Sequence, residues 1–208
     1  MERFPFHHFD LHTRERLELY AEELLKWSKT YNLIGPCTRE VLFNRHFLDG
    51  VLLLDQVATI KTLADIGSGA GLPGIVVALL AQHIETICLI EPRKKRVRFL
   101  NHVVQLLQLN KVTVFHGLAK EAAKRWNGTF DTVVSRGLGD LILGAREAWP
   151  LLAPGGTHIA FKGSNYPLEQ QQFTHHQISA CYDAPKILYE SMETGNRMVA
   201  LIKKEVCA

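Results

Sequence analysis

The sequence predicts an α/β fold in which helices cover a doubly wound, mostly parallel sheet. Short apolar or β-branched segments alternate with helical segments over most of the 208 residues. A glycine-rich turn follows the first of these strands, and an acidic residue ends the second. Alternation of this kind builds parallel sheets, whose ligands bind at the carboxyl ends of the strands. We therefore expect a ligand site where the first two strands end.

The N-terminal part is predicted to be a helical extension. Apolar positions recur at helical spacing from Thr13 to Tyr31, and Gly35-Pro36 ends this segment. The segment from Arg39 to Leu54 also has a helical pattern. We expect one domain over residues 1–208, with the extension at 1–60 and a cofactor-binding α/β core at 61–208.

The core is predicted to contain five parallel strands and a final pair of strands. Each segment is short, rich in apolar or β-branched residues and bounded by turn residues. The strands are Thr62–Ile66, Thr86–Ile90, Val112–Phe115, Phe130–Ser135 and Thr157–Lys162, and the final pair lies near Ile178–Tyr189 and Arg197–Lys203. Predicted helices include Ile75–Ala81, a segment with apolar spacing from Phe99 to Leu107, and Leu141–Leu152.

The ten residues that begin at Asp65, DIGSGAGLPG, predict the kind of ligand. They form a strand end, a tight turn and a helix start, where a nucleotide-like ligand lies against bare backbone. A dinucleotide fingerprint needs glycine three residues after Gly69, but this chain has Leu72 there. The alternating Gly67, Gly69 and Gly71 suit S-adenosylmethionine, whose ammonium group the preceding acid can bind. A plain glycine turn is the alternative.

An acidic residue at the tip of the second strand supports an adenosine-type cofactor. Glu91 lies twenty residues after Gly71. An acid at this place holds ribose hydroxyl groups in nucleotide-binding α/β folds. A helix N-cap before Pro92 is the other reading, and the two roles are compatible. A nicotinamide oxidoreductase is disfavoured by Leu72.

Composition argues against membrane, disulfide and metal classes. No apolar run is long enough to span a membrane, and the N-terminal MERFPFHHFD lacks the apolar stretch of a signal peptide. The adjacent histidine pairs have no ligand spacing, so no metal site is predicted. The cysteines have no CxxC spacing and suggest neither a disulfide framework nor a zinc site; they are Cys37, Cys88, Cys181 and Cys207. We expect a cytoplasmic protein without a membrane partner.

Positive charge is concentrated next to the expected cofactor acid. The formal net charge is +3, yet residues 91–136 hold ten Lys or Arg against three acids. Cations in the first turn of a helix oppose its dipole, so this run does not serve helix stability. An anionic partner such as RNA phosphate explains it, and a solvated helix face is the alternative. The candidate RNA-binding residues here are Arg93, Lys94, Lys95 and Arg96.

Six segments, taken in order, resemble one family. They are KWSKTYNL from Lys26, RHFLD from Arg45, the glycine run, KRVRFL from Lys95, FDTVVSR from Phe130 and FKG from Phe161. Together they are similar to the ribosomal small-subunit methyltransferase G family, also called glucose-inhibited division protein B, over nearly the whole chain. The resemblance implies the class I methyltransferase fold, with a seven-stranded sheet and an N-terminal helical extension. It also implies methyl transfer from S-adenosylmethionine to N7 of a guanine in the 530 loop of 16S rRNA.

The same resemblance implies cofactor contacts. They would come from Gly67, Leu72, the backbone at Ala119 and Lys120, and the side chain of Arg136. The partner would be 16S rRNA or the small ribosomal subunit, including an assembly intermediate, and we expect a monomer. One segment departs from the family pattern: GLAKE replaces Ser-Arg-x-Glu-Glu, so Leu118 stands in place of the arginine. An altered cofactor affinity is expected.

The residues after the fourth strand are compatible with a ring nitrogen as the target. Guanine N7 has a lone pair and no proton, so its methylation needs positioning and no general base. Exocyclic-amine methyltransferases carry an Asn/Asp-Pro-Pro-aromatic motif here, but this chain has Ser135-Arg136-Gly137. A pyrimidine C5 methylase needs a cysteine near the fourth or fifth strand, and Pro36-Cys37 precedes the cofactor strand. A small-molecule methyltransferase or a non-catalytic RNA-binding protein is the alternative.

Three residues are candidates for the catalytic group, namely Arg136, His46 and Arg45. Arg136 ends the fourth strand, where it would orient the guanine through O6, a phosphate or the cofactor. Its alternative is a surface ion pair with Asp140. His46 lies beside Arg45 and Asp49, and it either packs as an ordinary helix residue or helps to hold the cofactor pocket or RNA.

Asn32 and Lys162 are further candidates for RNA contact. Asn32 belongs to the Tyr-Asn-Leu segment, and a helix cap is its alternative role. Lys162 closes the fifth strand at the ligand edge of the sheet, where a solvated lysine is the alternative to a phosphate or base contact.

Overall fold

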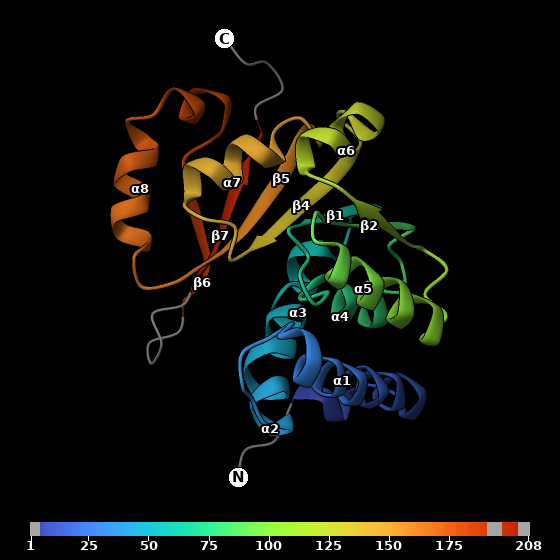
Figure 1. The fold of residues 1–208 in the computed structure, drawn as a ribbon. Helices are drawn as coiled ribbons and strands as arrows, with labels where there is room; N and C mark the ends of the chain where they lie inside the picture. The colour runs from blue at the N-terminus through green and yellow to red at the C-terminus, as the bar shows by residue number, and fades with distance from the viewer. Residues whose placement is uncertain (1–4, 191–196, 204–208) are drawn as a thin grey trace.

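The computed structural model describes residues 5–190 and 197–203, which are built around a seven-stranded sheet (Figure 1). The strand order is β3-β2-β1-β4-β5-β7-β6. Strands β1 to β5 pair in parallel, and β7 pairs antiparallel with β5 and β6. The bounds are β1 Thr62–Ile66, β2 Thr86–Glu91, β3 Val112–His116, β4 Phe130–Arg136, β5 Leu152–Lys162, β6 Lys186–Glu190 and β7 Arg197–Ile202. The predicted α/β fold is confirmed, and its topological switch point lies between β1 and β4.

Helices cover both faces of the sheet (Figure 1). One face carries α1 (Leu11–Tyr31), α4 (Gly74–Leu80) and α5 (Lys94–Leu106), and the other carries α6 (Ala119–Trp126), α7 (Leu141–Ala148) and α8 (Tyr166–Thr174). Successive residues of β1 alternate between them, because Leu63 joins the first core and Ala64 the second. In the described part of the chain, no helix combines the length and the apolar character that a membrane crossing requires.

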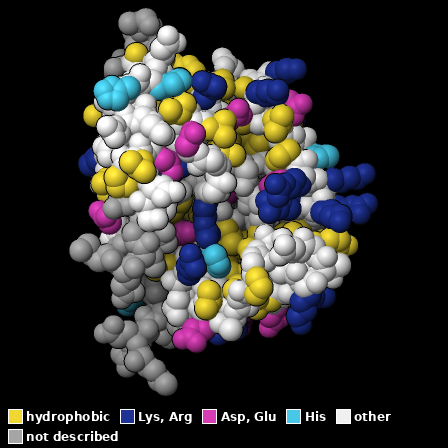
Figure 2. All heavy atoms as spheres, turned by 60° about the vertical axis from the view of Figure 1, so that its left-hand side comes forward, with side chains coloured by type: hydrophobic (Ala, Val, Ile, Leu, Met, Phe, Trp, Pro, Cys, Tyr) yellow, Lys and Arg dark blue, Asp and Glu magenta, His cyan; other side chains and the backbone are white. Residues whose placement is uncertain are grey.

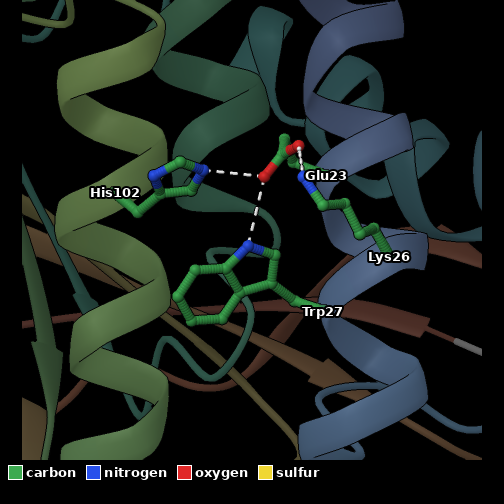
Figure 3. A network of polar contacts seen from close by, with 4 residues as sticks. All are labelled: Glu23, Lys26, Trp27 and His102. Carbon is green, nitrogen blue, oxygen red and sulfur yellow. Dashed lines mark hydrogen bonds and ion pairs between the residues drawn. The ribbon is translucent and has the colours of Figure 1, made fainter.

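The first helix is fixed to the core by polar contacts. Figure 3 shows the Glu23 carboxylate of α1 facing His102 of α5. Glu23 Oε2 accepts a hydrogen bond from the indole of Trp27 on the same helix (3.1 Å) and lies 2.7 Å from His102 Nε2. One turn earlier, the buried Tyr20 hydroxyl donates to the Ala70 carbonyl in the glycine turn (2.7 Å). The extension is therefore held against α5 and against the expected cofactor site.

The segment predicted to be helical over Arg39–Leu54 is helical without a gap from Arg39 to Leu52, but its helix type changes along the way. It consists of α2 (Arg39–Val41), a π-helical turn η2 (Leu42–Phe47), α3 (Leu48–Leu52) and a 3-10 turn η3 (Leu54–Val57). Phe43 and Phe47 of the π-helical turn are both buried in the core. Gly50 allows α3 to approach α4 closely, since a Cβ there would lie 2.5 Å from Val76 Cγ1. Hydrophobic periodicity does not reveal such a local widening.

The boundary between α7 and β5 also differs from the prediction. The helix expected to reach Leu152 ends at Ala148, and β5 begins at Leu152 instead of Thr157. Backbone geometry explains the long strand, because Gly155 has a φ of 72° and a Cβ at Gly156 would lie within 3.1 Å of three carbonyl oxygens. The glycine pair 155–156 is therefore an irregularity inside the strand.

The strand predicted near Ile178–Tyr189 is shorter than expected. Its first part forms a 3-10 turn η4 (Gln177–Cys181), and only Lys186–Glu190 pairs as β6. The buried Tyr182 hydroxyl donates a hydrogen bond to the Ala145 carbonyl of α7 (2.8 Å). This contact holds the chain against α7 before the strand begins.

Cysteine pairing corrects another expectation. Cys181 is disulfide-bonded, which the spacing of the cysteines did not predict, whereas Cys37 and Cys88 are free. Cys207 lies outside the described residues.

Candidate active site

The glycine turn after β1 has the backbone geometry that only glycine adopts easily. Gly67, Gly69 and Gly71 have φ values of 70°, 59° and 87°. The Gly67 amide donates to the Ile90 carbonyl (2.9 Å), which holds the turn against the end of β2. The turn is therefore a preformed feature of the backbone.

Asp65 presents a buried oxygen without a partner. Its side chain is almost completely buried, and Oδ2 accepts a hydrogen bond from the Gly74 amide (3.0 Å). Oδ1 has no hydrogen-bond partner among the residues that the structure describes. Burial raises the pKa of this carboxyl to about 7, against the lowering effect of the Gly74 amide and Arg136. An ammonium group would satisfy this oxygen, which fits the methionine end of the predicted cofactor.

Hydrogen bonds from the glycine turn and from the residue before α5 hold the side chain of Glu91 in position. Its Oε2 accepts a hydrogen bond from the Gly69 amide (2.8 Å), and its Oε1 accepts one from the Arg93 amide (2.8 Å). Arg96 Nη1 lies 3.8 Å from Oε2. The N-cap of α5 is Arg93 and the helix begins at Lys94, so the expected role of Glu91 as an N-cap before Pro92 is wrong. The contact of Glu91 with ribose stays a prediction.

A first cavity of about 380 Å³ lies at the carboxyl ends of β1, β2 and β4. Gly67 and Glu91 line one side, Ala119 and Lys120 at the start of α6 line another, and Gly137 lies at its border. Ala119 and Lys120 therefore line the same cavity as the glycine turn, and their contact with the cofactor stays a prediction. We call this space the cofactor cavity.

Leu72 and Leu118 both lie near the glycine turn, but only Leu118 lines the cofactor cavity. Leu118 also lines the cofactor cavity and is 43% exposed, and its amide donates to Glu121 Oε2 (2.7 Å). Leu72 is buried in the core beside the turn. Contact between Leu72 and the cofactor stays a prediction.

A second cavity of about 260 Å³ adjoins the first at Gly137, which lines both. Its walls combine charged side chains from the extension and the sheet with an apolar surface. The charged residues are Arg45, Asp49, Arg136 and Lys162, and the apolar or aromatic residues are Phe161, Tyr189 and Met198. We call this space the substrate cavity.

Arg136 connects the sheet with the extension across the substrate cavity. Its Nη1 lies 3.2 Å from Asp49 Oδ2, and its Nη2 forms a hydrogen bond with His46 Nδ1. The proposed surface pair with Asp140 is wrong, because Asp140 caps α7 by accepting from the Leu143 amide (2.7 Å). The predicted grouping of Arg136, His46 and Arg45 is brought together, with Asp49 as a further member.

The protonation states follow from burial and neighbouring charge. Burial and the adjacent Arg136 and Arg45 lower the pKa of His46 to about 4, so its neutral imidazole accepts a hydrogen bond from Arg136. Burial raises the pKa of Asp49 to about 6, and the two arginines oppose this shift. At neutral pH, Asp49 is therefore anionic and His46 uncharged.

Lys162 lies in the substrate cavity, but its ammonium group already has two partners. It donates to the Gly139 carbonyl (2.7 Å) and lies 2.6 Å from Glu169 Oε2. It thereby anchors the loop after β4 to α8. An RNA contact of Lys162 stays a prediction that requires sharing or exchange of these partners.

The basic run at the start of α5 divides into two parts. Arg93, Lys94 and Lys95 are exposed, and Figure 2 shows Lys and Arg side chains gathered at the edge of this face of the molecule. Arg96 is half-buried and turns towards Glu91 and the glycine turn. The Lys95 ammonium lies 5.9 Å from the ring centre of Tyr31. The exposed part can meet an anionic partner beside the cofactor cavity.

Asn32 does not line either cavity. It ends α1 in a left-handed conformation (φ 49°, ψ 51°), and its amide donates to the Ser28 carbonyl (3.0 Å). The structure thus gives it the role of a helix cap. Sequence reasoning did not single out Phe161 or Tyr189, although Phe161 belongs to the FKG segment already compared with the family.

The fold, the glycine turn and the adjoining cavities define a class I methyltransferase architecture. Solved structures share this fold: a cofactor-bound protein, Rv0187 from MTB, has a TM-score of 0.64 at 14% identity over 91% of this chain and 90% of its own. An O-methyltransferase from Bacillus cereus in complex with SAH has a TM-score of 0.60 at 15% identity, over 96% of this chain and 94% of its own.

Sequence comparison identifies the family. The profile of rRNA small subunit methyltransferase G matches residues 13–197. A ribosomal RNA small subunit methyltransferase G from Desulfitobacterium hafniense is 38% identical over 72% of this chain and 63% of its own length. One from Magnetococcus marinus is 29% identical over 94% of this chain and 89% of its own length. This chain belongs to the rRNA small subunit methyltransferase G family.

Proposed function

We propose that this protein methylates N7 of a guanine in the 530 loop of 16S rRNA. The observation that carries the proposal is the meeting of the cofactor cavity and the substrate cavity at Gly137. Membership of the family supports small-subunit rRNA as the substrate, since the named relatives are ribosomal RNA small subunit methyltransferases.

The cofactor is S-adenosylmethionine, and this chain has groups that suit each part of it. The free Oδ1 of Asp65 would accept the ammonium group, Glu91 would lie beside the ribose, and the backbone at Ala119 and Lys120 would border the adenine. When bound, the cofactor supplies a sulfonium methyl group that a lone pair can attack. The left-handed glycines let the ligand lie directly against the turn.

The substrate cavity supports a reaction that needs no general base. His46, the imidazole beside Arg136, is neutral but has its Nδ1 engaged as a hydrogen-bond acceptor. Guanine N7 carries no proton, so the residues need only to hold the lone pair in line with the methyl group. Arg136 would do this through O6, a phosphate or the cofactor, because a hydrogen bond to N7 would block the attacking pair.

The exposed cations of α5 support binding to an RNA backbone. Arg93, Lys94 and Lys95 lie outside the cofactor turn, where phosphates would neutralise them. We place the reaction in the cytoplasm, with the protein acting as a monomer and a single domain. Its substrate is free 16S rRNA, an assembly intermediate or the small subunit.

The test is methyl transfer from labelled cofactor to small-subunit RNA from cells that lack this protein. The RNA is digested to nucleosides, which are separated and identified by mass. We expect the label in 7-methylguanosine and little label with the Arg136→Ala variant. Unlabelled RNA, or label in another nucleoside, would overturn the proposal.

A further inference from the structure

The substrate cavity contains an acidic residue, Asp49, whose position suits contact with a ligand as well as the ion pair with Arg136. Among the described residues that line this cavity, Asp49 is the one carboxylate beside Arg45, Arg136 and Lys162. Its side chain is 23% exposed, so a ligand in the cavity can reach it. Its contact with Arg136 is made by Oδ2. A carboxylate accepts about four hydrogen bonds, so it retains capacity for two donors of a ligand.

The chemistry of guanine matches a carboxylate in this place. The Watson–Crick edge of guanine carries two adjacent donors, N1–H and the exocyclic N2 amine. Adenine has a ring acceptor instead of the first donor and no amine at the second position. A carboxylate is an acceptor only, and its paired oxygens match two neighbouring donors. It therefore favours guanine and repels the adenine edge.

The two cavities fix how the base must lie. N7 belongs to the five-membered ring, whereas N1 and N2 lie on the far side of the six-membered ring. If N7 faces the cofactor cavity at Gly137, the Watson–Crick edge lies deeper in the substrate cavity. Phe161, Tyr189 and Met198 provide apolar surface for the faces of the base. The cavity of about 260 Å³ is near the lower limit for small-ligand pockets, which suits one base.

We infer that Asp49 selects the target base, because its carboxylate accepts hydrogen bonds from N1–H and N2–H of guanine. This inference rests on the proposed function. The carboxylate would also stabilise the positive charge that develops on the base during the reaction. The N7 lone pair forms the new N–C bond, the electrons of the S–C bond stay on sulfur, and no proton leaves. The base becomes cationic and its N1–H more acidic, so its hydrogen bond to the carboxylate strengthens in the transition state.

A purely structural role for Asp49 makes a different prediction. If Asp49 only holds Arg136, its removal slows the reaction equally for every base that presents N7 and O6. If it accepts from the N2 amine, its removal abolishes a preference for guanine over a base that lacks this amine. Inosine is such a base, because it keeps N7, O6 and N1–H.

The experiment uses two copies of the small-subunit RNA target, with guanosine or inosine at the methylated position. We expect the wild-type protein to favour guanosine by about tenfold or more in kcat/KM, the worth of one hydrogen bond to a charged group. Asp49→Ala and the isosteric Asp49→Asn should bring this ratio close to one. Asp55→Ala, which removes an exposed carboxylate from the same extension, should keep the wild-type ratio.

Binding provides a second readout if turnover is too slow. Fluorescence anisotropy with the two RNAs, in the presence of S-adenosylhomocysteine, should show the same loss of preference, and thermal melting should show that the variants are folded. A wild-type protein that does not distinguish the bases, or an Asp49 variant that keeps the full preference, would overturn the inference alone. Failure of the wild-type protein to methylate either RNA would overturn the proposed function as well.

Discussion

The two cavities differ in how the chain builds them. The cofactor cavity is lined by the segments that follow the ends of the parallel strands β1, β2, β3 and β4, at Gly67, Glu91, Gly117 and Gly137. The substrate cavity is formed by charged side chains from distant elements: Arg136 and His46 are 90 residues apart. The first is therefore built at the strand ends of the parallel sheet. The second also depends on the docking of the helical extension, which supplies Arg45, His46 and Asp49.

The largest expected effect is the loss of methyl transfer in Arg136→Ala. The change removes the group that would orient the base, so we expect a decrease of about 100-fold or more in single-turnover rate. Cofactor affinity, measured by calorimetry, should change much less, because Glu91 and the glycine turn remain. The ion pair with Asp49 is partly exposed, so its loss should cost at most about 1 kcal/mol, or 2–4 °C in melting temperature. A near-normal rate would contradict the assigned role.

Substitutions at two glycines of the same turn should affect different properties, ligand binding at Gly69 and stability at Gly71. Gly69→Val should abolish measurable binding of S-adenosylhomocysteine, because the side chain would occupy the ligand's place. The nearest atom to a Cβ there is the flexible Arg96 Nη1 at 3.5 Å, so the main cost to the fold is about 1–2 kcal/mol of left-handed strain.

Gly71→Val is the matched comparison within the turn. Its Cβ would lie 2.5 Å from Ile75 Cγ1 and 3.0 Å from Leu100 Cδ2, so melting temperature should fall further than in Gly69→Val. Equal melting temperatures, or full affinity of a folded Gly69→Val protein, would contradict this division.

Cofactor binding should be coupled to proton release from Asp65. The pKa of this carboxyl is raised to about 7 in the protein without ligand, and an adjacent ammonium group favours the charged form. Below pH 7, binding must therefore expel a proton, and affinity should rise with pH until about 7 and then level off. The slope should approach tenfold per pH unit.

Calorimetry at pH 6 in two buffers of different ionisation enthalpy measures this proton directly. S-Adenosylhomocysteine is a suitable ligand because it retains the ammonium group. Asp65→Asn should bind more weakly and without this pH dependence. If the wild-type protein releases no proton, the ammonium does not bind at Asp65.

The smallest effect is expected at the exposed cations. Lys94→Glu should weaken RNA binding several-fold and reduce the salt slope by about one, because one phosphate contact is lost. Cofactor affinity should not change. Lys61→Glu is a matched charge reversal at the amino-terminal end of β1, away from the strand ends that line the cofactor cavity. It should leave the salt dependence of RNA binding unaltered. If both variants show the same salt dependence of RNA binding, the basic run is only a solvated helix face.

The difference between the two cavities also explains which features could be predicted from the sequence. The alternating strands and helices of the core, the glycine turn and the acid at Glu91 follow from local patterns, because hydrophobic periodicity and glycine spacing act over a few residues. The π-helical turn at Leu42–Phe47 and the early start of β5 at Leu152 were missed, since packing at Phe47 and the glycine pair 155–156 decides them. Periodicity does not record such contacts.

The substrate cavity shows the same limit at the level of single residues. Arg136, His46 and Arg45 could be grouped only through a resemblance to the family, because nothing local connects β4 with the extension. Asp49, the ion-pair partner of Arg136, was recognised only as a neighbour of His46 in sequence. Asn32, in an equally suggestive segment, proved to be a helix cap.

The most direct test of the account is to map the methylated base in 16S rRNA from cells with and without this protein. The account predicts that one N7-methylguanine in the 530 loop disappears when the protein is removed and returns with the wild-type chain but not with Arg136→Ala. An unchanged 530 loop, or the loss of a methyl group from another atom or base, would contradict the claim that the two cavities bring guanine N7 to the cofactor.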